Sequence, residues 1–154
     1  MNKKNIIIFS VMLLVIFLDQ SSKFFVKNNF KLTQSVPIIK EVLHFTYINN
    51  TGSAFGLFKN FNIIFILFSV IVILIILYNL KKINEKEKAM QLSVGLLLGG
   101  TIGNLIDRLY NDSVIDFIDL RFWPVFNIAD SAVTISIAIL IFILWNKENI
   151  FYQR

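Results

Sequence analysis

The chain has 154 residues, of which 56% are hydrophobic and only 16% are charged, and its formal net charge is +5. This composition excludes an ordinary soluble domain and indicates a protein that lies largely in lipid. The chain has no cysteine and a single histidine, His44. A disulfide framework, a thiolate nucleophile and a cysteine-based metal site are therefore excluded, and a histidine-rich metal site or a Ser-His-Asp triad is hard to build.

Four segments approach the roughly 20 apolar residues that a membrane-spanning helix needs. The predicted spans lie at about 5–26, 61–80, 89–107 and 129–146. The first and the last reach spanning length only if Asp19 and Asp130 belong to the helix ends. Lys3 and Lys4 precede the first apolar stretch as they would in a cleavable signal peptide, but no small-x-small cleavage site follows that stretch, so we expect this helix to be retained.

Two segments outside the spans, 27–60 and 108–128, are predicted to be extracytoplasmic. Hydrophobic alternation from Val42 to Ile48 is typical of a strand with its turn at 49–52, and a second extended piece from Val114 to Phe122 is expected to pair with it or with a lipid-facing neighbour. The predicted fold class is an all-α membrane protein. It is a single domain, residues 1–154, built as a four-transmembrane-helix bundle with a small extracytoplasmic β-rich segment.

Connectivity alone gathers polar side chains at one face of the bundle, because consecutive spans alternate in direction. The side chains brought to this face are Asp19, Lys23, Asn50, Asp107, Arg108, Asp116, Asp119 and Asp130. Their side of the membrane carries seven Lys or Arg and seven Asp or Glu, whereas the other side carries eight and three, so the whole excess charge lies opposite the polar face.

The eight cations are concentrated in two tails and one short loop. The positive-inside rule therefore predicts that both termini are cytoplasmic and that the polar face points outward. The basic charge is thus a topology signal, and we expect no nucleic-acid partner because no stripe of aromatic and basic residues is present.

The third predicted span combines small residues with a polar end. Glycines recur every four residues, at Gly95, Gly99 and Gly103, and this pattern allows close packing of a neighbouring helix. Asn104, Asp107 and Arg108 follow on neighbouring turns, so the glycine seam ends in an amide, an acid and a guanidinium on one helical face. In the first span, Asp19 and Lys23 are four residues apart and are expected to form an ion pair that anchors the helix.

Asp116 and Asp130 are the strongest candidates for chemistry. Taken singly, Asp116 is an ordinary loop carboxylate and Asp130 a helix N-cap. Brought close together, two carboxylates share one proton, and the pair then supplies a general acid and a general base for a water molecule. Such a pair hydrolyses a peptide bond without Cys, His or a metal. The spacing of fourteen residues through an irregular loop does not show that the two side chains meet.

Three other titratable residues have simpler interpretations. Asp112 lies in a polar turn and is expected to be solvated, while Asp119 is expected to pair with Arg121 across a strand face. His44, in its alternating strand, is expected to be a half-buried side chain and no ligand.

Five motifs occur in the same order as in the bacterial lipoprotein signal peptidases, also called signal peptidase II, and the chain closely resembles that family over essentially its full length. The motifs are Asp19-Gln20-x-x-Lys23, Asn50-x-Gly52-x-Ala54-Phe55, Gly99-Gly100-x-x-Gly103-Asn104-x-x-Asp107-Arg108, Val114-x-Asp116-Phe117 and Phe126-Asn127-x-Ala129-Asp130. Each motif is weak alone, but five in order on a four-span frame are highly specific.

The resemblance implies an aspartic endopeptidase of the bacterial cytoplasmic membrane that removes the signal peptide from prolipoproteins, cutting before a diacylglyceryl-modified cysteine. It implies that Asp116 and Asp130 are the catalytic pair. It further implies that five residues bind substrate or support the site, namely Asn50, Gly52, Asn104, Arg108 and Asn127. Asp19, Lys23 and Asp107 are expected to be structural supports.

We expect no cofactor and no metal. The expected partners are lipid-modified prolipoproteins and membrane lipids, and the protein is expected to be a monomer. The alternative interpretation is a non-enzymatic four-helix membrane protein, such as a proton-coupled transporter subunit, since acids in spans also build proton relays. A relay should reach both membrane faces, whereas the acids here gather on one side and the second span is uncharged.

Overall fold

A computed structural model describes residues 3–52 and 61–151 of the chain. Its helices are α1 (Lys3–Asn29), α2 (Asn62–Asn79) with the short 3-10 turn η2 (Leu80–Lys82), α3 (Lys88–Asn111) and α4 (Ile128–Phe151), and its strands are β1 (Ser35–Ile39), β2 (Leu43–Asn50) and β3 (Val114–Asp119). Four helices within these residues are long and apolar enough to cross a membrane, over Lys3–Asn29, Asn62–Lys82, Lys88–Asn111 and Ile128–Asn146. The predicted bundle with a small β-rich part is confirmed.

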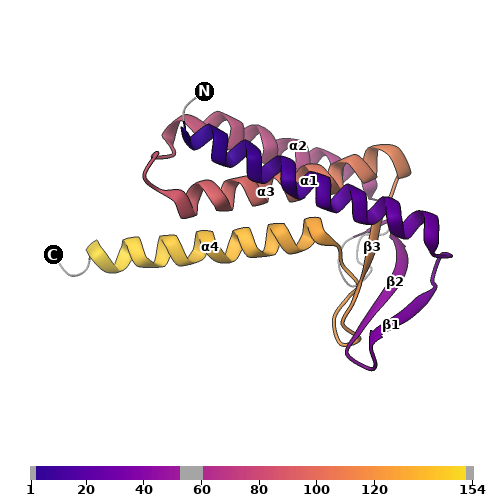
Figure 1. The fold of residues 1–154 in the computed structure, drawn as a ribbon. Coiled ribbons are helices and arrows are strands. Elements are labelled where there is room, and N and C mark those ends of the chain that lie inside the picture. Colours follow the sequence, from indigo (N-terminus) through magenta and orange to yellow (C-terminus); the bar gives the residue numbers. More distant parts are fainter. Residues whose placement is uncertain (1–2, 53–60, 152–154) are drawn as a thin grey trace.

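The strands form a sheet at one end of the helical bundle, while the Lys3 end of α1 and the far end of α4 lie at the opposite end (Figure 1). The strand order is β1-β2-β3, with antiparallel neighbours. The pairing of β2 with β3 brings Ile48 opposite Asp116 and Asn50 opposite Val114. Two partners were predicted for the second extended piece, and the strand predicted from Val42 to Ile48, which corresponds to β2, is the correct one.

Helix α3 lies at the centre of the bundle. In the most apolar stretch of α3, 44% of the residues are buried, against 6% in the corresponding stretch of α2. Most side chains of α2 are therefore available for contact with lipid. The glycine seam explains this packing. A Cβ atom added at Gly95 or Gly99 would lie within 3.0 Å of backbone and side-chain atoms of α1, and one added at Gly100 would meet the carbonyl of Ala129 on α4. Both neighbouring helices thus approach α3 at backbone distance, as small-residue stripes permit in membranes.

Several element boundaries differ from the predicted ones. The segment 49–52 was expected to be a turn, but Asn49 and Asn50 belong to β2, where they pair with β3. Strand β3 ends at Asp119, three residues before the predicted Phe122, because Arg121 adopts a left-handed conformation (φ 69°) and its N–H donates to Asp119 Oδ1 at 2.8 Å. Helix α3 continues past 107 to Asn111 and ends where Asp112 is left-handed (φ 53°).

Strand β1 was not predicted. It is an edge strand that contains Pro37, and proline cannot donate to a sheet ladder, so its sequence lacks the usual strand signal. An apolar cluster of Val26, Tyr47, Ile115 and Phe117 fastens the sheet to the end of α1. This cluster positions β3, and with it Asp116, against the helices.

Candidate active site

Asp116 lies in the middle of β3 with 2% of its surface exposed. Its Oδ1 accepts a hydrogen bond from Asn127 Nδ2 at 2.7 Å, and its Oδ2 accepts one from Asn50 Nδ2 at 2.9 Å. Burial, and next to it the charge of Asp130, raise the pKa of Asp116 to about 7, although both hydrogen bonds work in the opposite direction. A carboxyl pKa in this range is one that a general acid working near neutral pH needs.

Asp130 lies in the first turn of α4, and the structure corrects its expected capping role. The N-cap is Asn127, whose Oδ1 accepts from the Asp130 N–H at 2.8 Å, while Asp130 Oδ2 accepts from the Asn127 N–H at 3.2 Å. This reciprocal pair is a capping box, with Asp130 at its third helical position. The remaining oxygen, Oδ1, accepts from Asn104 Nδ2 at 2.7 Å.

The two acids therefore converge, which the spacing alone did not show. Both line one cavity of about 590 Å³, located where the end of α3, β3 and the start of α4 meet. Each of their four carboxyl oxygens accepts one N–H, and Asn127 contacts both acids. The carboxylate of strand β3 and that of the first turn of α4 are thus parts of one arrangement.

Three asparagine side chains hold this arrangement, and each has its amide oxygen fixed by a group that is only a donor. The oxygen of Asn50 accepts from the Gly52 N–H at 3.0 Å, that of Asn104 from Lys23 Nζ at 3.0 Å, and that of Asn127 from the Asp130 N–H. Since an amide has its donor opposite its acceptor, each NH2 group points to a carboxylate. The predicted supporting residues Asn50, Asn104 and Asn127 are brought together at the acids.

Arg108 and Gly52 also line the cavity. The Arg108 guanidinium lies over the ring of Phe65 on α2, with 5.0 Å between its Cζ and the ring centroid, and it faces the charges of Asp116 and Asp130. Phe65 was not singled out from the sequence, because an aromatic residue in an apolar span carries no signal of a cation contact. Ala54 and Phe55, which belong to the quoted motif, lie outside the described residues.

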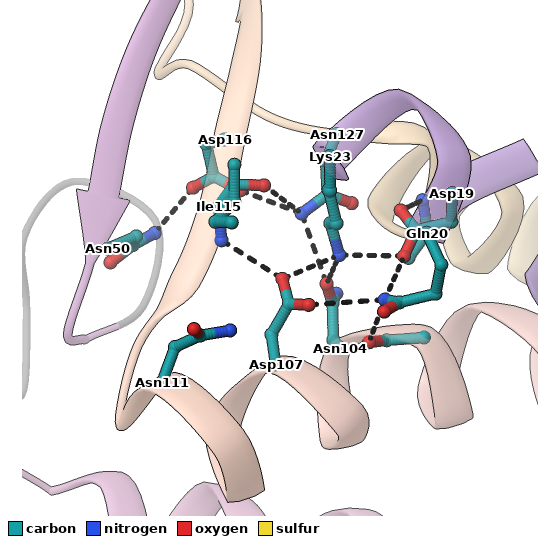
Figure 2. Close-up of polar contacts among 12 residues, drawn as sticks. Asp19, Gln20, Lys23, Asn50, Asn104, Asp107, Asn111, Ile115, Asp116 and Asn127 are labelled. Atoms are coloured by element: carbon teal, nitrogen blue, oxygen red, sulfur yellow. Dashed lines mark hydrogen bonds and ion pairs between the residues drawn. The ribbon is translucent and has the colours of Figure 1, made fainter. Parts of the chain in front are cut away.

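A buried ion cluster of Lys23, Asp19 and Asp107 lies beside Asn104, which contacts Asp130 (Figure 2). Lys23 Nζ is 2.7 Å from Asp19 Oδ2 and 3.0 Å from Asp107 Oδ2, and all three side chains are at most 3% exposed. Asp19 Oδ1 also accepts from the Ala129 N–H of α4, and Asp107 Oδ2 from the Ile115 N–H of β3. The predicted pairing of Asp19 with Lys23 is confirmed.

Gln20 links the two acids of this cluster, although no separate role was predicted for it. Its Nε2 lies 3.1 Å from Asp19 Oδ2, from Asp107 Oδ1 and from the Gly103 carbonyl. The cluster therefore fixes α1, α3, α4 and β3 relative to one another.

The competing acids lie elsewhere. Asp119 accepts from Thr46 Oγ1 at 2.7 Å and pairs with Arg121 at 3.0 Å, as predicted, but Arg121 lies beyond the end of β3 and not on its face. Asp112 is exposed. His44 is half-buried, as predicted, and its Nδ1 lies 3.1 Å from Ser35 Oγ. Within residues 3–52 and 61–151, no group of three or more His, Asp or Glu side chains is arranged to hold a metal ion.

Apart from Ser131 and Thr134, the rest of the cavity lining is apolar. Its apolar lining comes from the loop after β3 and the first turns of α4, and includes Leu120, Phe122, Trp123, Pro124, Val125, Phe126, Val133 and Ile135. Sequence reasoning missed these residues, because a loop rich in aromatic side chains is also expected simply at a membrane interface. The fold and this site together define a multi-span membrane protein with an acid-containing, mostly apolar cavity at one end of its bundle.

Comparison with known proteins extends this description to a family. A family model described as signal peptidase (SPase) II matches residues 11–146. A lipoprotein signal peptidase of Halothermothrix orenii is 44% identical over 143 residues, which cover 93% of this chain and 98% of that protein. A lipoprotein signal peptidase of Moorella thermoacetica is 44% identical over 128 residues, covering 83% of this chain and 85% of that protein.

Solved structures agree with this assignment. A bacterial membrane enzyme determined by the in meso method at 2.3 Å resolution matches with a TM-score of 0.86 and 30% identity, over 90% of this chain and 87% of that chain. A second such enzyme, at 1.9 Å resolution, matches with a TM-score of 0.80 and 31% identity, over 87% and 89%. The chain belongs to the signal peptidase II family and is a multi-pass bacterial membrane peptidase. The family sets aside the alternative of a non-enzymatic membrane protein.

Proposed function

We propose that this chain is an aspartic endopeptidase that removes the signal peptide from prolipoproteins by cutting before a diacylglyceryl-modified cysteine. Asp116 and Asp130 are its catalytic pair. The observation that carries the proposal is their convergence on one cavity, with every carboxyl oxygen held by an amide N–H. The relatives named lipoprotein signal peptidase support the substrate class.

The environments of the two acids suggest different roles. Burial and the neighbouring charge raise the pKa of Asp116 to about 7, which favours Asp116 as the protonated general acid. Asp130 lies in the first turn of α4, where the positive end of the helix dipole and two N–H donors favour a negative charge. Asp130 is then the general base.

In this scheme Asp130 takes a proton from a water molecule while the water oxygen attacks the scissile carbonyl carbon. Asp116 gives its proton to the carbonyl oxygen, so the tetrahedral intermediate forms without a full negative charge. Collapse of the intermediate breaks the C–N bond. The proton on Asp130 passes to the leaving amine and the proton of the intermediate returns to Asp116, which restores the starting state.

The cavity lining suits a lipid-modified substrate. Loop residues Phe122 and Trp123 and helix residues Val133 and Ile135 give apolar surface beside the acids, while Arg108 offers donors for the polar peptide backbone. A peptide entering from lipid needs such donors, because lipid offers none. The concentration of cations at the opposite end supports cytoplasmic termini and an outward-facing site. One copy of the chain holds all these groups, so we propose a single domain that acts as a monomer.

Cleavage of a synthetic diacylglyceryl-modified prolipopeptide by the purified protein in detergent tests the proposal. Asp116→Asn and Asp130→Asn should each abolish cleavage, since neither variant retains a carboxyl pair. Asp112→Asn is the matched control, because it makes the same chemical change at an exposed position where asparagine tolerates the left-handed backbone. Full processing by either active-site variant would refute the pair, and equal processing of the unlipidated peptide would refute the lipid requirement.

A further inference from the structure

Lys23 does not line the cavity, yet it contacts one of the amides that hold the acids. Its Nζ lies 2.7 Å from Asp19 Oδ2, 3.0 Å from Asp107 Oδ2 and 3.0 Å from Asn104 Oδ1. An ammonium group has three donors and no acceptor, so these three oxygens use its full hydrogen-bonding capacity. The Asn104 amide must therefore present its oxygen to Lys23 (Figure 2).

The orientation of this one amide decides what Asp130 faces. With its oxygen toward Lys23, the Asn104 NH2 donates to Asp130 Oδ1 at 2.7 Å, and the same oxygen accepts from Asn127 Nδ2 at 3.0 Å. A reversed amide would set its NH2 against two donors, Lys23 and Asn127, and its oxygen against a carboxylate. Reversal would thus replace three attractive contacts by three repulsive ones.

We propose that Lys23 is a positioning residue for the reaction: its ammonium group holds the Asn104 amide with the NH2 toward Asp130, and this orientation presents a hydrogen-bond donor to the carboxylate that accepts the proton in the reaction. This inference rests on the proposed function, because Asp130 is there the general base. Lys23 touches neither the cavity nor the reacting atoms. It acts through Asn104, and it gains its own fixed place from Asp19 and Asp107.

The test must separate this role from a general effect of charge. Charged groups face this region from each neighbouring element, namely Asp19 on α1, Asp107 and Arg108 on α3, Asp116 on β3 and Asp130 on α4, while α2 has no charged residue. Removing Lys23 alone would leave Asp19 and Asp107 without their cation, and such uncompensated buried charges destabilise proteins strongly. The double variant Lys23→Met/Asp107→Asn removes one charge of each sign and is compared with Asp107→Asn, which retains Lys23.

Infrared titration of the carboxylic acid C=O band gives a readout independent of cleavage, with the Asp130 band assigned as the one that is lost in Asp130→Asn. Relative to Asp107→Asn, the double variant should titrate about one pH unit higher, since it lacks both the ammonium and the oriented amide. Its kcat on the lipidated prolipopeptide should fall about 10- to 100-fold with KM little changed, because chemistry and not binding is misaligned. An unchanged or lower titration midpoint would overturn the proposal, even if kcat falls.

Asn104→Leu provides the second variant, and it separates orientation from charge. It keeps Lys23 with its two carboxylate partners, so the ion cluster and the fold are retained, but it removes the amide between Lys23 and Asp130. We expect the midpoint of its carboxyl titration to move to higher pH as well. An unmoved midpoint would show that the Asn104 amide does not influence the carboxyl group and would overturn the proposal. Absence of cleavage by the unmodified protein would refute the proposed function alone, because the infrared titration would still decide the role of Lys23.

Discussion

Raising the pH from 5 to 8 is expected to destabilise this protein through one buried carboxyl group, that of Asp116. Its pKa is about 7 in the folded protein, against 3.8 for the ordinary value that applies in the unfolded chain. Between these two values the folded state binds the proton and the unfolded state does not, so the free energy of unfolding falls as the pH rises. The full difference corresponds to about 4 kcal/mol, of which about 2–3 kcal/mol is lost between pH 5 and pH 8.

Thermal unfolding in detergent measures this loss, with the fluorescence of Trp123 and Trp145 as the probe. A change of 2–3 kcal/mol should lower Tm by about 5–10 °C in a chain of this size. Other groups titrate in the same window, so the quantity to compare is the pH dependence of the protein minus that of Asp116→Asn, which lacks the group. If Tm falls equally in both proteins between pH 5 and pH 8, the ionisation of Asp116 has no measurable cost in the folded protein, and the reasoning from its burial is refuted.

Three further changes test separate parts of the structure. Asn50→Ala removes a hydrogen bond that lowers the pKa of Asp116, so the decline of cleavage at alkaline pH should move to higher pH, while kcat falls about tenfold. Gly100→Ala places a methyl group against the Ala129 carbonyl and should lower the free energy of unfolding by about 1–3 kcal/mol, seen as a lower Tm. Asp119→Asn should keep its cleavage rate within about threefold, since Asp119 is engaged by Thr46 and Arg121 in the sheet, and a loss like that of Asp116→Asn would contradict this.

The sequence predicted the parts of this protein that depend on periodicity and local spacing. The four spans were located because lipid demands long apolar helices, and the Asp19–Lys23 pair because residues four apart share a helical face. The glycine stripe likewise predicted close packing, which the approach of α1 to Gly95 and Gly99 confirms. These features are decided within one helix, so a single sequence contains their cause.

The remaining features depend on the tertiary structure. The contact of Asn127 with both acids arises because β3 pairs with β2 while α4 begins beside α3, and no local pattern contains that geometry. The N-cap was assigned to Asp130 and not to Asn127 for a related reason. An aspartate before an apolar run fits the N-cap and the third helical position equally well. Lys23 was assigned to its i, i+4 partner alone, because its contacts with Asp107 and Asn104 join residues more than 80 positions apart.

In the proposed mechanism, the choice of amides beside the acids follows from the chemistry that a shared proton requires. A cation bonded directly to either carboxylate would stabilise the ionised form and lower its pKa, and the pair would then lose the proton that the general acid must donate. Asn50, Asn104 and Asn127 fix all the carboxyl orientations through N–H donors, yet they add no charge. Positive charge is still needed to balance the buried acids, and it comes from Lys23, one hydrogen bond further away, and from Arg108, which lines the same cavity. Amide donors on both carboxylates thus allow the proposed site to be rigid and still to keep one exchangeable proton near neutral pH.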